Sequence, residues 1–397
     1  MIIPSFSSRL PAALTSNRLA GAVARRRASG QALIDLTASN PTKVGFAYPP
    51  DLLASLAFPA NLVYDPEPAG IESARQAVAE ELARRGTAVR AADIILTAST
   101  SEAYGYLFKL LCDPGDEVLV PQPSYPLFEW LTRLDGVAAR PYRLAYHGRW
   151  TLDAHSLAAV VTPRTKAILL VNPNNPTGSF FTRRDFERLA DVAPGVPLIG
   201  DEVFWDFVLD GVPADRAGVL ESGRGLVFSL GGLSKSAALP QLKLGWIAIG
   251  GEAARVEEAR AKLELIADTY LSVSTPVQTA AGALVAAGAG LRAQILERAT
   301  RNLASLRTSI ARHPALNLLT TEGGWSAIVR VPATRSEEDL AVALVEEDGV
   351  LVHPGYFFDF EREAYVVLSL IAPPVDFDTG VSRLLAKTGS ASSASRG

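Results

Sequence analysis

One lysine stands where an apolar strand is expected to end. Residues 225–236 read GLVFSLGGLSKS, so Lys235 follows a buried strand and two glycines and lies between two serines. A lysine that loses water on several sides disfavours its ammonium form, and its free amine is a nucleophile toward aldehydes. The alternative is an ordinary solvated lysine in a loop, because a short motif by itself has a real rate of false matches. The polar residues at other strand ends decide between the two interpretations.

Two further strands are expected to end in residues that suit a flat, phosphorylated ligand. Residues 99–101 read Ser-Thr-Ser between a strand and a helix, so their amides can bind an anion. A plain helix cap is the commoner use of such residues. The loop 121–126 reads PQPSYP and projects Tyr125, whose ring is suited to stacking on a heteroaromatic ring. The alternative for Tyr125 is a buried ring packed on proline.

Amides and a carboxylate follow the next two strands. Residues 171–178 read VNPNNPTG, which fixes a tight turn but holds more asparagines than a turn requires. Residues 200–204 read GDEVF, and the apolar residues around Asp201 place its carboxylate at the edge of a core. An ionised carboxylate in such a place needs a cationic partner.

Composition limits the class of protein. The chain has 397 residues, is 48% hydrophobic and carries a formal net charge of -4, which suits two packed domains and gives no electrostatic reason to expect a nucleic acid or an anionic membrane as partner. A single cysteine excludes an intrachain disulfide, and the four histidines show no metal-ligand spacing, so we expect no metal. No apolar run is long enough to cross a bilayer, and we expect a cytoplasmic enzyme.

The expected elements divide the chain into two domains. Up to about residue 250, short apolar strands alternate with helices, which predicts an α/β fold with a mostly parallel sheet flanked by helices and function at the strand ends. Beyond it, helices and strands suggest a smaller α+β domain, with an amphipathic N-terminal helix over Arg9–Ala28 packed on it. We expect a large domain at 45–275, a small domain at 1–44 and 276–389, and a disordered tail at 390–397.

Together these groups suit pyridoxal 5'-phosphate (PLP), which needs a lysine for an imine, a carboxylate, an amide donor, an aromatic plate and a phosphate turn. Their order and spacing resemble the fold-type I, class I/II aminotransferases over about residues 36–385. The resemblance rests on Tyr64 with Gly70, on residues 99–101, 113–116 and 121–126, and on 172–178, 201–203 and Ser234-Lys235. It implies that the large domain binds PLP.

The resemblance also implies roles for single residues. Lys235 forms the internal aldimine and later moves the proton, Asp201 pairs with the pyridinium nitrogen, and Asn175 donates to the ring hydroxyl. Tyr64 matches a tyrosine that reaches the cofactor of the neighbouring subunit, so a homodimer with composite active sites is implied. The other residues implied to contact the cofactor are Tyr125, Ser99, Thr100, Ser101, Ser234 and Lys243.

The implied activity is a transaminase reaction, in which an amino group passes from an amino donor such as an amino acid to a 2-oxo acid in a biosynthetic process. A lyase of the same fold, cleaving a β-substituent or a C–S bond, uses the same lysine and stays open. A non-catalytic PLP-binding protein is the third alternative, although the sequence has no basic segment of the kind that a DNA-binding regulator needs.

Three positions depart from the family pattern. Lys243 replaces an arginine of the phosphate site, and Phe204 replaces a tyrosine that contacts the cofactor. Val367 replaces the arginine that binds the substrate carboxylate, so either another group holds that carboxylate or the substrate is not an ordinary α-amino acid. Candidate substrate residues are Ser39, Asn40, Trp205 and Trp325, and Asn175 is a further candidate for the carboxylate.

Overall fold

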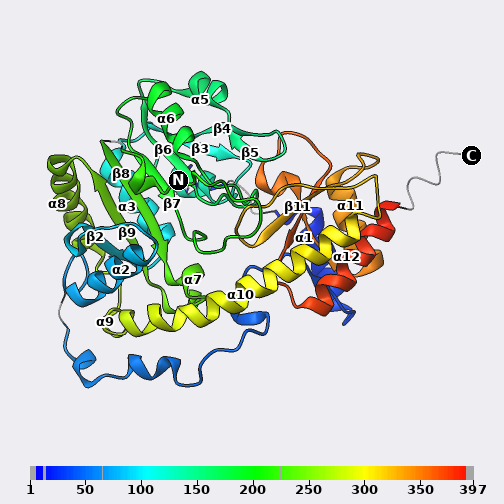
Figure 1. Cartoon of the computed structure of the whole chain (residues 1–397), viewed down its shortest axis with the longest axis horizontal. Coiled ribbons are helices and arrows are strands. Elements are labelled where there is room, and N and C mark those ends of the chain that lie inside the picture. Colours follow the sequence, from blue (N-terminus) through cyan, green and yellow to red (C-terminus); the bar gives the residue numbers. More distant parts are fainter. Residues whose placement is uncertain (1–5, 12–14, 65, 224, 390–397) are drawn as a thin grey trace, which may run out of the picture.

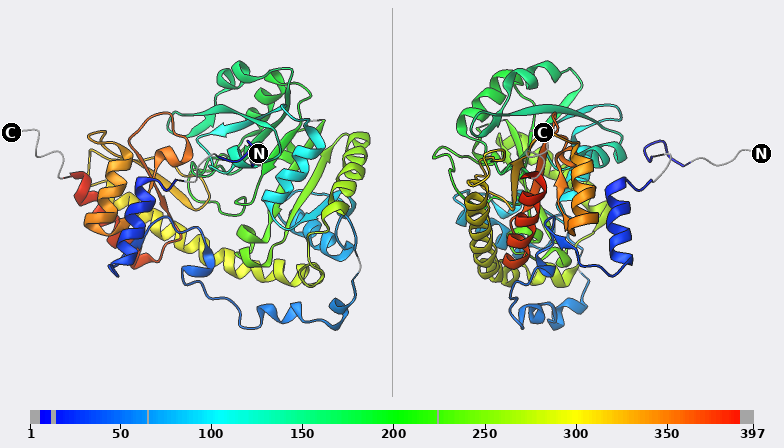
Figure 2. Two further views of the ribbon diagram at one scale, coloured as in Figure 1. Left: turned by 180° about the vertical axis from the view of Figure 1, so that it is seen from behind. Right: turned by 90° about the vertical axis from the view of Figure 1, so that its right-hand side faces the viewer.

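The structure is a computed structural model that describes residues 6–11, 15–64, 66–223 and 225–389. Within these residues the chain forms two parts, which lie side by side in Figure 1 and Figure 2. The larger is built on an eight-stranded sheet and the smaller on a four-stranded antiparallel sheet. The expected α/β architecture, with a smaller α+β part, is therefore confirmed.

The large sheet has the strand order β2-β9-β8-β7-β6-β3-β4-β5. Neighbours from β8 to β4 run parallel, whereas β9 is antiparallel to both β2 and β8, and β5 is antiparallel to β4. The strands are β2 (Ile94–Thr97), β3 (Glu117–Gln122), β4 (Ala138–Tyr146), β5 (Trp150–Leu152), β6 (Thr165–Val171), β7 (Leu198–Asp201), β8 (Leu226–Gly232) and β9 (Gly245–Gly251).

The register of three central strands brings the predicted site residues to one edge. Val171 at the end of β6 pairs with Asp201 at the end of β7, and Asp201 pairs with Leu230 of β8. These strands are continuous apolar runs because helices bury both of their faces. As a result, the segments that begin after Val171, Asp201 and Leu230 leave the sheet next to one another.

Helices cover both faces of the large sheet. One face packs against α3 (Thr100–Leu111), α4 (Phe128–Leu134) and α8 (Ala253–Tyr270). The other face packs against α2 (Glu72–Arg84), α5 (Ala154–Val160), α6 (Arg183–Val192) and the first half of α10 (Ala281–Ile310). The short helix α7 (Leu233–Ser236) follows β8 directly and carries Lys235, and α9 (Thr275–Thr279) precedes α10.

The small part has the strand order β10-β11-β14-β13. Its core also takes in the second half of α10, which crosses from one part to the other as the long yellow helix of Figure 1. Its elements are α1 (Arg18–Ala28), β10 (Asn317–Leu318), β11 (Ser326–Arg330), α11 (Glu337–Ala343), β13 (His353–Pro354), β14 (Tyr365–Ser369) and α12 (Pro374–Gly389), with a parallel pair of β1 (Ile34–Asp35) and β12 (Val350–Leu351) beside them.

The N-terminal helix is shorter than the sequence predicts. It begins at Arg18, because the side chain of Asn17 accepts a hydrogen bond from the amide of Ala20 and caps the first turn. The expected tail at 390–397 lies outside the described residues, and the domain limits at 44/45 and 275/276 stay predictions. Along the described ranges no helix is long and apolar enough to cross a membrane.

Candidate active site

A cavity of about 350 Å³ lies where the two sheets meet. The large part contributes the ends of β6 and β7, the start of α3 and Lys235, and the small part contributes one face of its sheet. Its walls are formed by Thr37, Ala38, Ser39, Thr100, Ser101, Tyr125, Leu127, Phe128, Val171, Asn175, Asp201, Val203, Phe204, Lys235, Trp325, Ser326, His353, Phe357, Phe358, Val367 and Ser369. Sites of this kind, at strand ends and between domains, are usual for small ligands.

Lys235 lies in an apolar setting inside this cavity. Its Nζ is 5.0 Å from the ring centre of Trp325 and 5.6 Å from that of Phe204, and it donates a 3.4 Å hydrogen bond to the carbonyl oxygen of Ser39. Burial lowers the pKa of Lys235 to about 8, against the opposing effect of Asp201, which raises it. At neutral pH a useful fraction of the amine is therefore unprotonated and nucleophilic.

The lowered pKa gives a testable pH dependence. A neutral amine attacks an aldehyde and an ammonium does not, so the rate at which cofactor-free protein forms an imine with an aldehyde should rise with pH and level off above about pH 8. For an unburied lysine the rate of imine formation would keep rising to about pH 10. The rate is followed by the absorbance of the imine at a fixed aldehyde concentration. A profile still rising steeply between pH 9 and 10 would contradict the burial of Lys235.

Asp201 is the carboxylate that faces this lysine. The hydroxyl of Tyr104 donates to its Oδ2 at 2.8 Å, and the amide of Val203 donates to its Oδ1 at 3.2 Å. Burial raises the pKa of Asp201, and the two hydrogen bonds together with the charge of Lys235 act in the opposite direction. The charge of Lys235 favours the ionised carboxylate, and Tyr104, which the sequence analysis missed, orients it. A cationic partner in direct contact with Asp201 stays a prediction.

The three asparagines of the turn at 171–178 have two different roles. Asn172 donates to the carbonyl oxygen of Ala217 at 2.9 Å, and Asn174 donates to that of Pro123 at 3.0 Å, so both hold loops together. Asn175 lines the cavity, and its Oδ1 accepts a hydrogen bond from the hydroxyl of Ser326 at 3.3 Å. With Oδ1 as the acceptor in this contact, the amide nitrogen of Asn175 is available as a donor.

The serine turn at the start of α3 forms one end of the cavity. The hydroxyl of Ser99 accepts from the amide of Glu102 at 3.2 Å and so caps the helix, whereas Thr100 and Ser101 line the cavity. A Cβ at Gly245 would lie 3.0 Å from the carbonyl carbon of Ser99, so only glycine lets β9 pass this close to the turn. The amides at this helix start and the two hydroxyls suit a phosphate group.

Six predicted site residues do not line the cavity. Trp205 packs its ring on Phe180 and under the Arg216 guanidinium, and the Asn40 side chain accepts hydrogen bonds from Thr42, so neither reaches the substrate region. The remaining four are Ser99, whose hydroxyl caps α3, Ser234, which precedes the lysine, Lys243, which is exposed, and Tyr64, which is 72% exposed. Tyr125 does line the cavity, with 43% of its surface exposed.

The small sheet closes the cavity with uncharged groups. Val367 is 1% exposed and pairs with Ile328 on one side and His353 on the other. Burial lowers the pKa of His353 to about 4, so this imidazole is neutral at pH 7. Among the described residues that form the walls, Lys235 is the one side chain with a positive charge at neutral pH. The lack of a cationic partner for a substrate carboxylate, which the sequence predicts from Val367, therefore applies to this whole wall.

The wall residues that the sequence analysis missed are mostly aromatic residues and serines. Phe128 and Phe358 close the cavity, and Ser326 and Ser369 lie opposite each other on β11 and β14. The one available signal was the alternation along residues 365–369, which places Val367 and Ser369 on the same face of a strand.

The donor set fits pyridoxal phosphate. Lys235 with its lowered pKa can form an imine, Asp201 is a buried carboxylate that gains from a cationic ring nitrogen, and the start of α3 offers amides and hydroxyls to a phosphate. Along the described ranges no group of three or more histidine, cysteine, aspartate or glutamate residues could hold a metal ion. Fold and site together define the scaffold of fold-type I enzymes.

The comparison with known proteins makes this assignment specific. Residues 51–369 match the family described as aminotransferase class I and II, and the chain belongs to that family. It is 29% identical over 331 residues to nicotianamine aminotransferase A of Hordeum vulgare, covering 79% of this chain and 70% of that protein. It is 32% identical over 218 residues to nicotianamine aminotransferase 1 of Oryza sativa subsp. japonica, covering 54% of this chain and 43% of that protein.

The solved structures agree in fold. An alanine aminotransferase from Pyrococcus furiosus superposes with a TM-score of 0.84 at 22% identity, covering 94% of this chain and 96% of that one. Several of the first curated relatives are matched over less than half of their own length, for example over 43%, 39% and 40%. These likenesses fix the fold and the family, and the substrates have to be argued from the site.

Proposed function

We propose that this protein is a PLP-dependent aminotransferase that moves an amino group from an amino donor to a 2-oxo acid. The observation that carries the proposal is the buried pair of Lys235 and Asp201 at one sheet edge, beside a phosphate-binding helix start. When bound, PLP serves as the electron sink for a substrate carbanion. Thr100 and Ser101 support the phosphate, Tyr125 offers its ring, and Asn175 donates to the ring hydroxyl.

Lys235 has two tasks in this proposal. Its free amine would hold the cofactor through the aldehyde group, and its Nζ would be the base that takes the proton from the substrate α-carbon. The rings of Trp325 and Phe204 exclude water around Nζ, which keeps the amine basic enough to accept a proton and uncharged enough to act at neutral pH. Asp201 holds its negative charge against the ring nitrogen.

We also propose a cytoplasmic homodimer with composite active sites and a biosynthetic role. Exposed apolar side chains support a second copy as the partner, because much exposed apolar surface is unusual on a monomer. They lie in residues 53–64, before β2, and on or just after α8, and Tyr64 and Leu271 line one pocket. The set is Leu53, Phe58, Leu62, Val63, Tyr64, Leu265, Tyr270 and Leu271. Tyr64 and Lys243, which lie outside the cavity, are assigned to the phosphate through this assembly.

The half-reaction tests the proposed function against its main alternative. The holoenzyme is mixed with single amino donors, and the absorbance of the bound cofactor is followed. A transaminase leaves the cofactor in its amine form, whereas a lyase releases product and keeps the aldehyde form. Adding a 2-oxo acid afterwards should restore the aldehyde form. Persistence of the aldehyde form with every donor, together with release of product, would instead establish the lyase.

Replacing Val367 with arginine should improve the use of amino acids. The guanidinium would give a substrate carboxylate the charged partner that the wall of the cavity lacks, and a hydrogen bond to a charged group contributes about 1.5–3 kcal/mol, or roughly 10- to 100-fold. The measurement compares kcat/KM for L-phenylalanine and for phenethylamine, which differ by the carboxylate alone. We expect Val367→Arg to raise the value for the amino acid and not for the amine.

The control for this change is Val367→Leu, which adds bulk without charge. An equal gain in the two variants would mean that size, not charge, limits the reaction. No gain in either variant would show that the wild-type site already binds the carboxylate well through neutral donors such as Ser39 or Asn175.

A further inference from the structure

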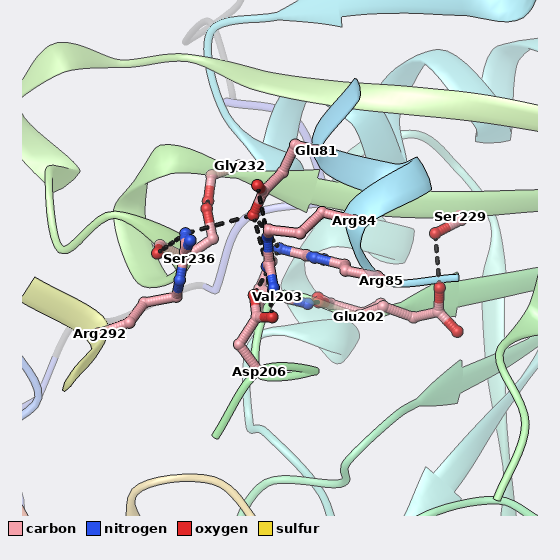
Figure 3. A network of polar contacts seen from close by, with 11 residues as sticks. Glu81, Arg84, Arg85, Glu202, Val203, Asp206, Ser229, Gly232, Ser236 and Arg292 are labelled. Carbon is pink, nitrogen blue, oxygen red and sulfur yellow. Dashed lines mark hydrogen bonds and ion pairs between the residues drawn. The ribbon is translucent and has the colours of Figure 1, made fainter. Parts of the chain in front are cut away.

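A cluster of buried charged side chains lies outside the cavity, between α2, α10 and the segment after β7 (Figure 3). The Arg85 guanidinium is 2.8 Å from Asp206 Oδ2 and 3.5 Å from Glu81 Oε1, and the side chains of Arg85 and Glu81 are 5% and 3% exposed. The Arg84 guanidinium is 2.8 Å from Glu81 Oε1 and 2.6 Å from Asp206 Oδ1. Two acids and the Arg85 guanidinium are thus interlocked where a core would ordinarily be apolar, and Arg84, whose side chain is 46% exposed, joins them from the surface.

Arg292 of α10 connects this cluster to the catalytic lysine. Its Nη1 lies 3.2 Å from Glu81 Oε1 and donates a 2.9 Å hydrogen bond to the carbonyl oxygen of Ser236, the residue after Lys235. The hydroxyl of Ser236 in turn donates to the carbonyl oxygen of Gly232 at 2.9 Å, which ties the short helix to the end of β8. Arg292 therefore contacts the backbone that carries Lys235.

Close packing reinforces this contact. A Cβ on Gly288, one turn before Arg292 on the same helix, would lie 2.7 Å from the Cβ of Ala237. The backbone of α10 therefore lies directly against the end of α7. A shift of Arg292 would be transmitted to α7 because no gap absorbs it.

Asp206 connects the same cluster to the other side of the lysine. It lies in the segment that leaves β7 after Asp201, where the amide of Trp205 donates to the carbonyl oxygen of Glu202 at 3.1 Å and that of Phe207 donates to Phe204 at 2.9 Å. These tight turns link the position of Asp206 to that of the Phe204 ring, which faces Nζ of Lys235. One ionic cluster thus contacts the backbone beside Lys235 through Arg292 and the segment that carries Phe204 through Asp206.

The cost of such a cluster suggests a role other than stability. Buried ion pairs lose much of their attraction to desolvation, and apolar residues of the same size often stabilise a core as well or better. What fixed guanidinium–carboxylate contacts provide is a defined geometry. We propose that Glu81 and Arg292 are positioning residues that hold Lys235 in its apolar place between Phe204 and Trp325.

The test uses the cofactor-free protein, in which the pKa of the Lys235 amine is measured from the pH dependence of its rate of modification, resolved at that residue by peptide mass spectrometry. If the cluster positions Lys235, both Glu81→Gln and Arg292→Met should let the lysine reach water. Its pKa should then rise from about 8 toward 10.5, by about one unit or more.

The sign of the two shifts separates positioning from simple electrostatics. Removing the negative charge of Glu81 by itself lowers the pKa of a nearby lysine, and removing the positive charge of Arg292 raises it. Charge effects alone therefore predict opposite shifts, whereas positioning predicts two increases. A decrease or no change in Glu81→Gln would overturn the proposal. Asp206→Asn, which removes the other carboxylate, is expected to behave like Glu81→Gln and replaces it if that variant does not fold.

Two control variants complete the experiment. Arg301→Met lies on the same helix and removes an exposed ion pair with Asp378, so it should leave the pKa of Lys235 unchanged. Arg292→Lys keeps a positive charge and a hydrogen-bond donor, so the pKa of Lys235 should rise less than it does in Arg292→Met. Urea unfolding of each variant confirms that the native state is being titrated. The inference rests on the proposed role of Lys235, but its readout needs no cofactor or turnover, so a failure of amino transfer would leave it standing.

Discussion

Lys235→Ala is expected to abolish amino transfer, with a loss of at least about 10⁴-fold in kcat. In the proposed mechanism this lysine both holds the cofactor and moves the substrate proton, and general acid–base catalysis by itself contributes about 10² to 10⁴. The fold should survive, because alanine removes a long side chain from a cavity and leaves the contacts of Ser236 with Arg292 and Gly232 intact. The measurement is the half-reaction under single-turnover conditions.

A matched control separates this effect from general damage. Lys262→Ala removes an exposed lysine on α8 that pairs with its neighbour Glu258 one turn away, so it should retain full activity. Small primary amines added to Lys235→Ala should restore part of the proton transfer because they replace the missing base. Full activity in Lys235→Ala without added amine would remove the lysine from the mechanism.

Asp201→Asn is expected to lower kcat by about 10²- to 10³-fold, the range seen when one preorganised electrostatic partner is removed from an active site. Asparagine keeps the shape of the side chain, and its single oxygen can still accept from the Val203 amide. Its NH2 group then faces the Tyr104 hydroxyl, which can turn to accept a hydrogen bond from it. It cannot supply the negative charge that keeps the cofactor ring nitrogen protonated. Cofactor binding, measured by absorbance, should weaken much less than turnover.

Asp201→Asn is also expected to raise the stability of the cofactor-free protein, although it lowers kcat. Burial raises the pKa of Asp201, so the ionised carboxylate is less favourable in the folded cofactor-free protein than in the unfolded chain. The neutral amide removes that cost, and Asp201→Asn should unfold at a higher temperature than the parent at pH 7. The difference should shrink as the pH falls and the parent carboxylate takes up its proton. Asp210→Asn, on the surface beside Arg307, is the matched control and should change neither property.

Much of the fold could be predicted because its signals are local. The strand β2 and the helix α3 lie where the apolar run and the Ser99 cap place them, and the central strands β6, β7 and β8 fall on their apolar runs. The strand β9 was missed because its residues, GWIAIGG, have glycines at both ends, which is typical of a loop. Only its pairing with β2 and β8 fixes it as a strand. The start of α1 was misplaced because apolar spacing continued upstream of its cap.

The site could be predicted in part for the same reason. Lys235, Asp201, Asn175, Thr100 and Ser101 follow strands directly, so sequence order and sheet topology are enough to bring them together. The opposite wall comes from β11, β13 and β14, far along the chain, and no local pattern says that its strands face the lysine. Trp205 and Asn40 were included because of residue type, but ring packing and a helix-cap role hold their side chains elsewhere.

Val367 lies in a neutral wall that faces Lys235, a lysine of lowered pKa. This arrangement suits imine chemistry and offers a substrate carboxylate no cationic partner on that wall. We therefore expect the small sheet to govern substrate choice and the large sheet to govern reactivity. The two properties can be altered separately, by Val367→Arg on one side and by Asp201→Asn on the other.

The central claim is that Lys235 binds the cofactor covalently, and borohydride reduction tests it most directly. The holoenzyme is reduced, digested and analysed by peptide mass spectrometry. The structure predicts one added cofactor group, located on the peptide that contains Lys235, and its absence from Lys235→Ala. A cofactor group on another lysine such as Lys243, or on no lysine at all, would contradict the account.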